Sequence, residues 1–194
     1  MKDIVIGTVL GDGYLEQHGK GVRLQVVHCV AQEPYVKWKH SELSVLLPSP
    51  MYLYNGKYPF WRFVTRSHPF LEKLRQIFYV NGKKCIPNDI NRYLDNPVSL
   101  AVWFMDDGTC DKRQGSILFE TQCFCQQDIE KLKKCLVSNF GLNTTIHKSG
   151  KGRGLRLYLS VKEALKFKSI IESFVLPEMR YKLPCTPVTT SLFN

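Results

Sequence analysis

The sequence lacks a hydrophobic run of the roughly 20 residues that a membrane span requires. It also lacks the paired spacings of a zinc site: Cys123 and Cys125 form CxC rather than CxxC, and the five histidines show no ligand spacing. No charged leader with a cleavable apolar core precedes the patterned segment at residue 4. The seven cysteines suggest no even disulfide framework. These absences predict a soluble protein without membrane association, in a bacterial cytoplasm or an organelle such as a mitochondrion or chloroplast.

Positive charge is what the chain has in excess. It contains 27 lysines and arginines against 17 aspartates and glutamates, a net charge of +10 at pH 7, and the basic residues are spread along its length. A basic folded surface predicts an extended polyanion as partner, most simply nucleic acid. Charge alone does not identify that partner, because many basic domains bind no specific polyanion.

One order of elements occurs twice in the chain. VIGTVLGDG at 5–13 aligns with LAVWFMDDG at 100–108, and each is followed by a polar turn and alternating β-rich segments. The pattern predicts helices at 3–12, 33–47, 67–80, 97–107, 126–141 and 162–175, and strands at 22–30, 51–55, 58–66, 116–124, 143–148 and 155–161. The short, apolar connector predicts two directly packed halves, 1–96 and 97–194.

Each repeated motif ends in a carboxylate, Asp12 in the first half and Asp107 in the second. A helix C-terminus already carries partial negative charge, so an acid there costs stability. Gly7 and Gly11 lie on one face of the first motif helix and allow another helix backbone to approach closely. Parallel packing of the two motif helices would make Asp12 and Asp107 neighbours. Paired carboxylates of this kind suit Mg²⁺, a hard cation that leaves coordination positions to water and phosphate oxygens.

A late lysine accompanies each acid. Lys84 and Lys182 each stand shortly before a proline, at nearly equal distances from Asp12 and Asp107. In phosphodiester hydrolysis a divalent metal activates water and neutralises charge on phosphorus. The two lysines would then orient or polarise the attacking waters, and each half would serve one strand of a duplex.

The two motifs resemble the paired motif of the LAGLIDADG homing endonucleases, and the resemblance covers essentially the whole chain. It implies an α+β fold of two pseudo-symmetric αββαββα repeats, with saddle-shaped antiparallel sheets and the motif helices at the interface. It further implies a monomer that makes a double-strand break in a long asymmetric DNA target, leaves 3′ overhangs and promotes mobility of its intron or intervening sequence. Asp12 and Asp107 would bind Mg²⁺, for which Mn²⁺ can substitute, and Lys84 and Lys182 would assist.

The two motifs differ at two positions. The first glycine of the motif is Gly7 in one helix and Val102 in the other, and the residue before the catalytic acid is Gly11 in one and Asp106 in the other. These departures predict an asymmetric helix interface. They leave Asp106 without a role.

Basic and amide-bearing side chains in or beside the strands are the candidates for contacting DNA. Arginine pairs with guanine and glutamine with adenine in the major groove. The candidates are Arg23, Gln25, His28, Arg62, Arg66, Glu120, Gln122, Lys148, Arg153 and Arg156. Each could instead solvate an outer sheet face. Helix lysines such as Lys39 are expected to be solvated or to contact phosphate.

An alternative function uses the same scaffold. An RNA-binding intron maturase, with intron RNA as its partner, would share the fold and the basic surface. Both acids and both lysines are retained here, and a chain that does not cut DNA has no evident reason to keep all four. That retention favours the endonuclease, while a protein with both activities stays open.

Overall fold

The computed structural model describes residues 1–150 and 154–184. Two consecutive runs of helix, strand, strand, helix, strand, strand and helix make up most of it. The first run comprises α1 (Lys2–Leu10), β1 (Tyr14–His18), β2 (Gly21–Cys29), α2 (Glu33–Glu42), β3 (Tyr52–Tyr54), β4 (Phe60–Val64) and α3 (Pro69–Phe78). The second comprises α4 (Pro97–Asp107), β7 (Gly108–Cys110), β8 (Ile117–Phe119), α5 (Gln126–Phe140), β9 (Thr145–Lys148), β10 (Leu155–Leu159) and α6 (Val161–Ile171).

Short segments complete the two runs. A two-stranded hairpin of β5 (Tyr79–Val80) and β6 (Lys83–Lys84) follows α3, and Lys84 therefore sits on a strand. A 3₁₀ segment, η6 (Pro177–Lys182), follows α6 and ends in Lys182. Among the described residues, no helix is both long and apolar enough to cross a membrane.

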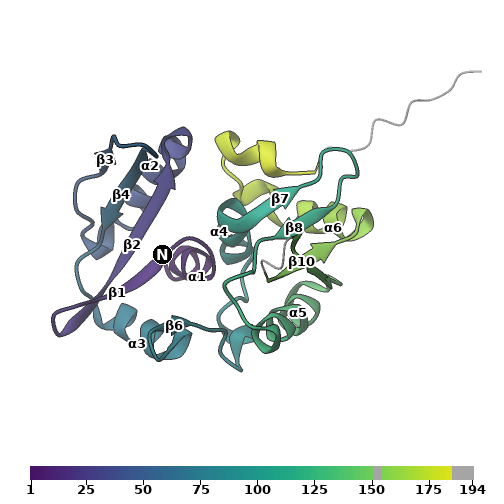
Figure 1. Cartoon of the computed structure of the whole chain (residues 1–194), viewed down its shortest axis with the longest axis horizontal. Helices are drawn as coiled ribbons and strands as arrows, with labels where there is room; N and C mark the ends of the chain where they lie inside the picture. Colours follow the sequence, from purple (N-terminus) through teal and green to yellow (C-terminus); the bar gives the residue numbers. More distant parts are fainter. Residues whose placement is uncertain (151–153, 185–194) are drawn as a thin grey trace, which may run out of the picture.

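Each half contains one four-stranded antiparallel sheet. The strand orders are β1-β2-β4-β3 and β7-β8-β10-β9, so the two sheets have the same topology. Figure 1 shows the sheets on either side of α1 and α4, which lie next to one another at the centre. The predicted α+β fold of two αββαββα repeats is confirmed.

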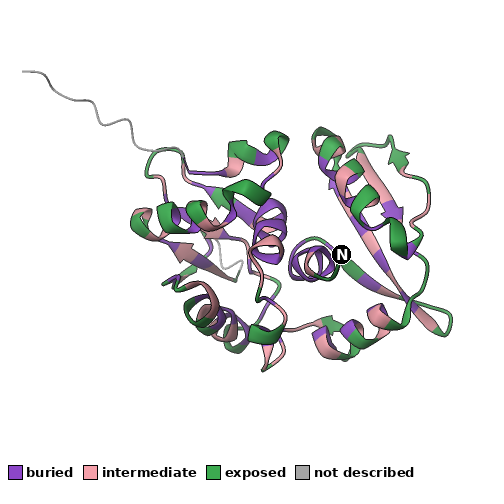
Figure 2. Ribbon diagram, turned by 180° about the vertical axis from the view of Figure 1, so that it is seen from behind, coloured by how far each residue is buried: buried purple, intermediate pink, exposed green. Residues whose placement is uncertain are grey.

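The central helices α1 and α4 are buried on nearly every side. Every residue from Ile4 to Leu10 is buried, as are those from Ser99 to Asp106, and both helices are purple in Figure 2. A helix that is apolar all round is stable only inside a core. The side chain of Asn96 accepts a hydrogen bond from the backbone N–H of Val98 and starts α4, with Pro97 at its first turn.

Glycines let α1 and α4 approach closely. A Cβ atom on Gly7 would lie 2.5 Å from the carbonyl oxygen of Ser99 and 2.6 Å from Cβ of Val102. A Cβ atom on Gly11 would collide with the side chain of Asp106. The positions that align in the two motifs therefore meet across the interface, and a glycine on one side makes room for a side chain on the other.

Several predicted element bounds were wrong. The segment after the first motif is a strand, β1, rather than a polar turn, because it pairs with β2 across a tight turn that contains Gly19 at φ +58°. The helix predicted at 33–47 ends at Glu42, and a 3₁₀ turn leads to Leu47 in the left-handed region, directly before Pro48. The strand predicted at 116–124 keeps only Ile117–Phe119 as β8.

Candidate active site

Each central helix ends against a lysine from its own half. The Lys84 ammonium donates hydrogen bonds to the carbonyl oxygens of Gly11 (2.8 Å) and Gly13 (2.9 Å). The Lys182 ammonium donates to those of Met105 (2.6 Å) and Asp106 (2.9 Å). The last carbonyls of a helix have no partner within the helix and carry its partial negative charge. The lysines therefore compensate the helix ends at which the acids stand.

Ionisation of the two motif-ending carboxylates, Asp12 and Asp107, is unfavourable in the folded protein. Burial, together with the charges of Asp12 and Asp106, raises the pKa of Asp107 to about 8. Burial and the charge of Asp106 also raise the pKa of Asp12, although its side chain is 47% exposed. Both acids thus resist ionisation in the protein alone, and a bound cation would relieve that resistance.

Asp106 is the centre of a buried polar network. Its two carboxylate oxygens accept hydrogen bonds from the Lys39 ammonium at 2.8 and 2.9 Å, and Oδ1 also accepts one from the Tyr35 hydroxyl at 2.7 Å. Oδ2 accepts a bond from the backbone N–H of Asp12 at 3.2 Å. Burial alone would raise the pKa of Asp106, but Lys39 and the other donors hold it below its ordinary value. The network links α2, α4 and the end of α1.

Two sequence predictions are corrected by this network. Lys39, expected to be solvated or to contact phosphate, has a fully buried side chain paired with Asp106. His28, expected on the DNA-contacting face of its strand, has a side chain that is only 1% exposed. Burial alternates along β2, and His28 shares its buried face with Leu24 and Val26. Strand periodicity was the available signal for His28, whereas nothing in the helical pattern marked Lys39 as buried.

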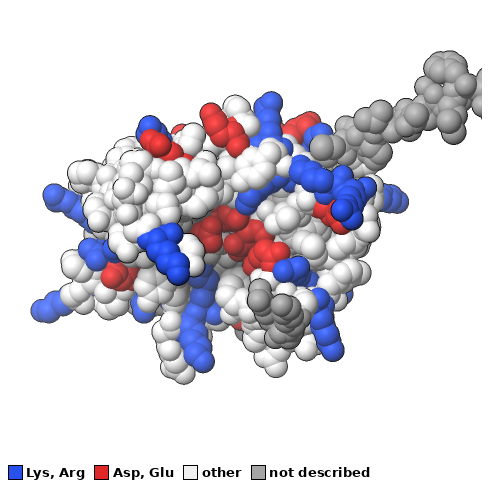
Figure 3. Space-filling model, turned by 45° about the horizontal axis from the view of Figure 1, so that its top comes forward, with Lys and Arg blue, Asp and Glu red and all other residues white. Residues whose placement is uncertain are grey.

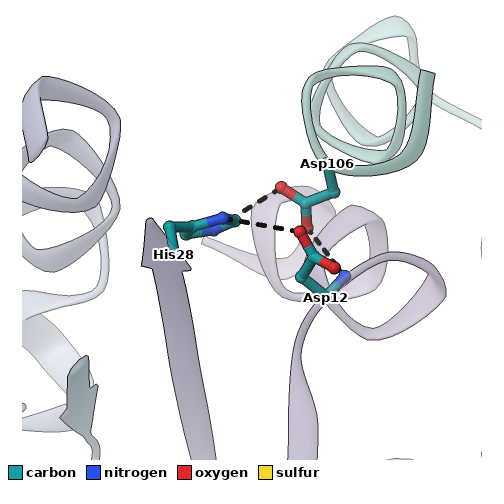
Figure 4. Close-up of side chains that lie close together, drawn as sticks. All are labelled: Asp12, His28 and Asp106. Atoms are coloured by element: carbon teal, nitrogen blue, oxygen red, sulfur yellow. Dashed lines mark hydrogen bonds and ion pairs between the residues drawn. The ribbon is translucent and has the colours of Figure 1, made fainter. Parts of the chain in front are cut away.

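The His28 side chain lies between the carboxylates of Asp12 and Asp106. Its Nδ1 lies 3.5 Å from Oδ2 of Asp12, and its Nε2 lies 3.7 Å from Oδ1 of Asp106 and 3.2 Å from the Lys39 ammonium. Figure 4 shows the imidazole on β2 facing both carboxylates. Burial and the Lys39 charge lower the pKa of His28 to about 4, so the ring is neutral at physiological pH.

Asp12, His28 and Asp106 are close enough to suggest a metal centre. One ligand atom from each lies within 4.8 Å of the others. Both oxygens of Asp106, however, already accept hydrogen bonds from buried donors. The carboxylates of Asp12 and Asp107 stay the predicted ligands of a hard cation, and the raised pKa of Asp107 fits a group that a cation would stabilise.

The model of the LAGLIDADG DNA endonuclease family matches residues 2–167. The chain belongs to this family.

This LAGLIDADG chain has relatives that match almost all of its length. It is 28% identical over 193 residues to "Probable intron-encoded endonuclease 1" of Wickerhamomyces canadensis, covering 94% of the chain and 83% of that protein. It is 27% identical over 194 residues to "Cytochrome b mRNA maturase bI2" of Debaryomyces hansenii, covering 94% of the chain and 73% of that protein. The solved structure of the homing endonuclease I-WcaI bound to its DNA recognition sequence matches with a TM-score of 0.86 and 29% identity, covering 95% and 86%.

The candidate DNA contacts of this LAGLIDADG chain lie on the strands of both sheets or in the segments that follow them: Arg23, Gln25, Arg62, Lys148 and Arg156 are on strands, whereas Arg66, Glu120 and Gln122 follow the ends of β4 and β8. Figure 3 shows acidic side chains gathered near the centre of one face, with lysine and arginine side chains around them. Several candidates are paired with one another or with acids: Arg23 with Glu16, Arg62 with Gln25, Arg156 with Glu120, and Gln122 with Glu120. Arg66 and Lys148 are exposed, and Arg153 lies outside the described residues.

Proposed function

We propose that this chain is a site-specific homing endonuclease that makes a double-strand break in a long asymmetric DNA target, leaving 3′ overhangs, and so promotes mobility of its intron or intervening sequence. The supporting observation is the repeated arrangement at the centre of the fold. An acid stands at or just beyond the C-terminal end of each of two packed helices, and each helix end receives a lysine from the end of the same half. A monomer thus contains two sets of groups, one for each DNA strand.

The proposed chemistry is metal-dependent phosphodiester hydrolysis. Asp12 and Asp107 would hold Mg²⁺, which Mn²⁺ can replace. When bound, the ion acidifies a water molecule and neutralises the charge that develops at phosphorus. Lys84 and Lys182 donate hydrogen bonds to the negative helix ends beside the acids, and from there they would orient the attacking waters.

DNA is the proposed substrate because of charge, family and similarity. The net charge of +10 suits an extended polyanion. The similar protein I-WcaI was solved bound to its DNA recognition sequence, and its structure matches almost all of this chain. Paired arginine and glutamine side chains on the sheets, such as Arg62 with Gln25, are suited to reading purines.

The test is cleavage of a randomised duplex library by the purified chain with Mg²⁺, followed by sequencing of the cut ends. We expect one long site to be enriched, with ends that carry 3′ overhangs. Asp12→Asn and Asp107→Asn should abolish cleavage while leaving binding of that site largely intact in a gel-shift assay. A chain that binds duplexes but leaves the whole library uncut with Mg²⁺ and with Mn²⁺ would contradict the proposal.

Intron maturation is the second candidate function. The relative from Debaryomyces hansenii is named a cytochrome b mRNA maturase and matches 94% of this chain. The discriminating measurement is the affinity of the chain for a panel of intron RNAs and the rate at which they splice, under the same conditions as the cleavage assay. Tight binding with accelerated splicing, in the absence of DNA cleavage, would support the maturase.

A further inference from the structure

The buried network contains a chain of hydrogen-bond donors that leads to Asp12. Lys39 on α2 is held by both oxygens of Asp106 on α4, and its Nζ lies 3.2 Å from Nε2 of His28 on β2. A protonated lysine has three donors and no acceptor. In this contact, therefore, Nε2 of His28 must be the acceptor.

That contact determines the tautomer of His28. A neutral imidazole carries one proton, so a ring whose Nε2 accepts carries its proton on Nδ1. The Nδ1 atom is buried, makes no hydrogen bond of ordinary geometry to a described residue, and lies 3.5 Å from Oδ2 of Asp12. Hydrogen bonds in an active site are often long without substrate and tighten in the reactive complex.

We propose that His28 is a positioning residue that donates its Nδ1–H to the carboxylate of Asp12, with its tautomer set by Lys39 and Lys39 held in place by Asp106. The catalytic consequence rests on the proposed endonuclease function. His28 restrains one oxygen of Asp12 and leaves the other for the cation. Asp106 then acts through Lys39 and His28 rather than as a metal ligand.

The chemistry excludes the simplest alternative for His28. Coordination of a metal by Nδ1 would need a lone pair on that atom, and the donor contact from Lys39 to Nε2 places a proton there instead. Gln32 is a second polar side chain near the ring and contributes to the pKa of His28, but no hydrogen bond of ordinary geometry joins them. Gln32 therefore serves as a control position.

Among the described residues, the second half has no matching arrangement. At the 95-residue spacing that relates Asp12 to Asp107, Cys123 stands where His28 does, and Gly11 stands where Asp106 does. Cys123 has no imidazole tautomer to set, and Gly11 has no carboxylate that could hold a lysine. The proposed positioning therefore applies to Asp12 and leaves Asp107 without an equivalent.

The tautomer is measured directly by long-range ¹H–¹⁵N correlation NMR of the full chain with labelled histidine. His28→Asn identifies the His28 signals by their loss. We expect a proton on Nδ1 in the parent protein. In the double variant Lys39→Met/Asp106→Asn, which removes both buried charges together, we expect the preference for that tautomer to be lost. A proton on Nε2 of His28 in the parent protein would overturn the proposal, whether or not the chain cuts DNA.

Kinetics test the consequence for Asp12. An asparagine amide can take the place of Nδ1, whereas a glutamine amide reaches the place of Nε2. His28→Gln should lower kcat about 10-fold or more, in the range found for groups that orient metal ligands, with KM for DNA unchanged. His28→Asn should recover most of that loss, and Gln32→Ala should match the parent rate.

Several outcomes would overturn the proposal. One is a His28→Gln variant that folds and has the kcat of the parent protein. Another is a Gln32→Ala variant whose kcat falls as far as that of His28→Gln. Equal loss of Mn²⁺ affinity in His28→Gln and His28→Asn, measured by electron paramagnetic resonance, would make His28 a metal ligand instead. A parent protein that cuts no DNA contradicts the proposed function, and the tautomer measurement then decides the positioning on its own.

Discussion

The ends of α1 and α4 are equivalent in the repeat but differ in how their acids are supported. Asp12 has a buried histidine within 3.5 Å and donates its backbone N–H to Asp106. Asp107 has a pKa of about 8, because burial and two neighbouring acids oppose its ionisation. One repeated motif thus places two acids alike at the helix ends but in different surroundings, with a buried imidazole beside Asp12 and with burial and two neighbouring acids opposing ionisation of Asp107.

The largest expected effect comes from breaking the buried pair of the first half. Lys39→Met should destabilise the protein by about 3–5 kcal/mol, because it leaves Asp106 buried and charged without its partner. Lys39→Met/Asp106→Asn should recover much of this loss. In the second half, Lys133→Met removes an exposed pair with Glu130 and should cost about 1 kcal/mol or less. Urea unfolding measures the free energy of unfolding of all three variants. Equal losses of stability in the two single lysine variants would contradict the difference between the halves.

The lysines at the helix ends test whether each half serves one DNA strand. Lys84→Met and Lys182→Met should each slow cleavage of one strand by about 10²-fold, the usual cost of removing a preorganised donor. Nicked duplex should accumulate, with the nick on opposite strands in the two variants. Sequencing gels of both labelled strands would show it. Lys83 is the exposed neighbour of Lys84 on β6, and the Lys83→Met variant should cut both strands at the parent rate. Nicks on the same strand in both variants would refute the division of labour.

The helix contact provides a smaller effect. Gly7→Ala should cost about 1–3 kcal/mol, because the added Cβ would lie 2.6 Å from Cβ of Val102 and the helices would have to separate. The better helix propensity of alanine offsets about 1 kcal/mol of this. Gly150→Ala meets nothing within 4 Å and should change stability by less than about 0.5 kcal/mol. Denaturant titration compares the stability of the two variants. A Gly7→Ala variant as stable as the parent protein would show that α1 and α4 can separate slightly without loss of stability.

The smallest expected effect concerns Asp107 and pH in metal-free protein. A carboxyl whose folded pKa is about 8 binds its proton more tightly than in the unfolded chain, so stability falls as pH rises from about 4 to about 8. Asp107→Asn removes that fall and should raise the Tm at pH 9, where the parent carboxylate is ionised. At pH 4 the two proteins should melt alike. Scanning calorimetry in EDTA measures it, and a lower Tm at pH 9 would contradict the raised pKa.

Much of the fold could be predicted from the sequence because the same motifs recur at the same spacing in both halves. Gly7 and Gly11 predicted a close helix contact, and the acids and lysines recurred at matching distances. The buried network was not accessible in the same way. Lys39 lies on a helix with no strong apolar face, and its burial depends on Asp106, which is 67 residues away in the chain. His28 was signalled by strand alternation, which the prediction of its DNA contact overlooked.

The meeting of Gly11 with Asp106 has a consequence for how the two halves can associate. In a symmetric dimer the interface is self-complementary, and a residue on the axis meets its own copy. Two copies of the first half would oppose glycine with glycine. Two copies of the second half would oppose one buried carboxylate with another, with Lys39 absent, since it belongs to the first half. The second half therefore needs a non-identical partner that supplies both the glycine and the lysine that its central carboxylate requires.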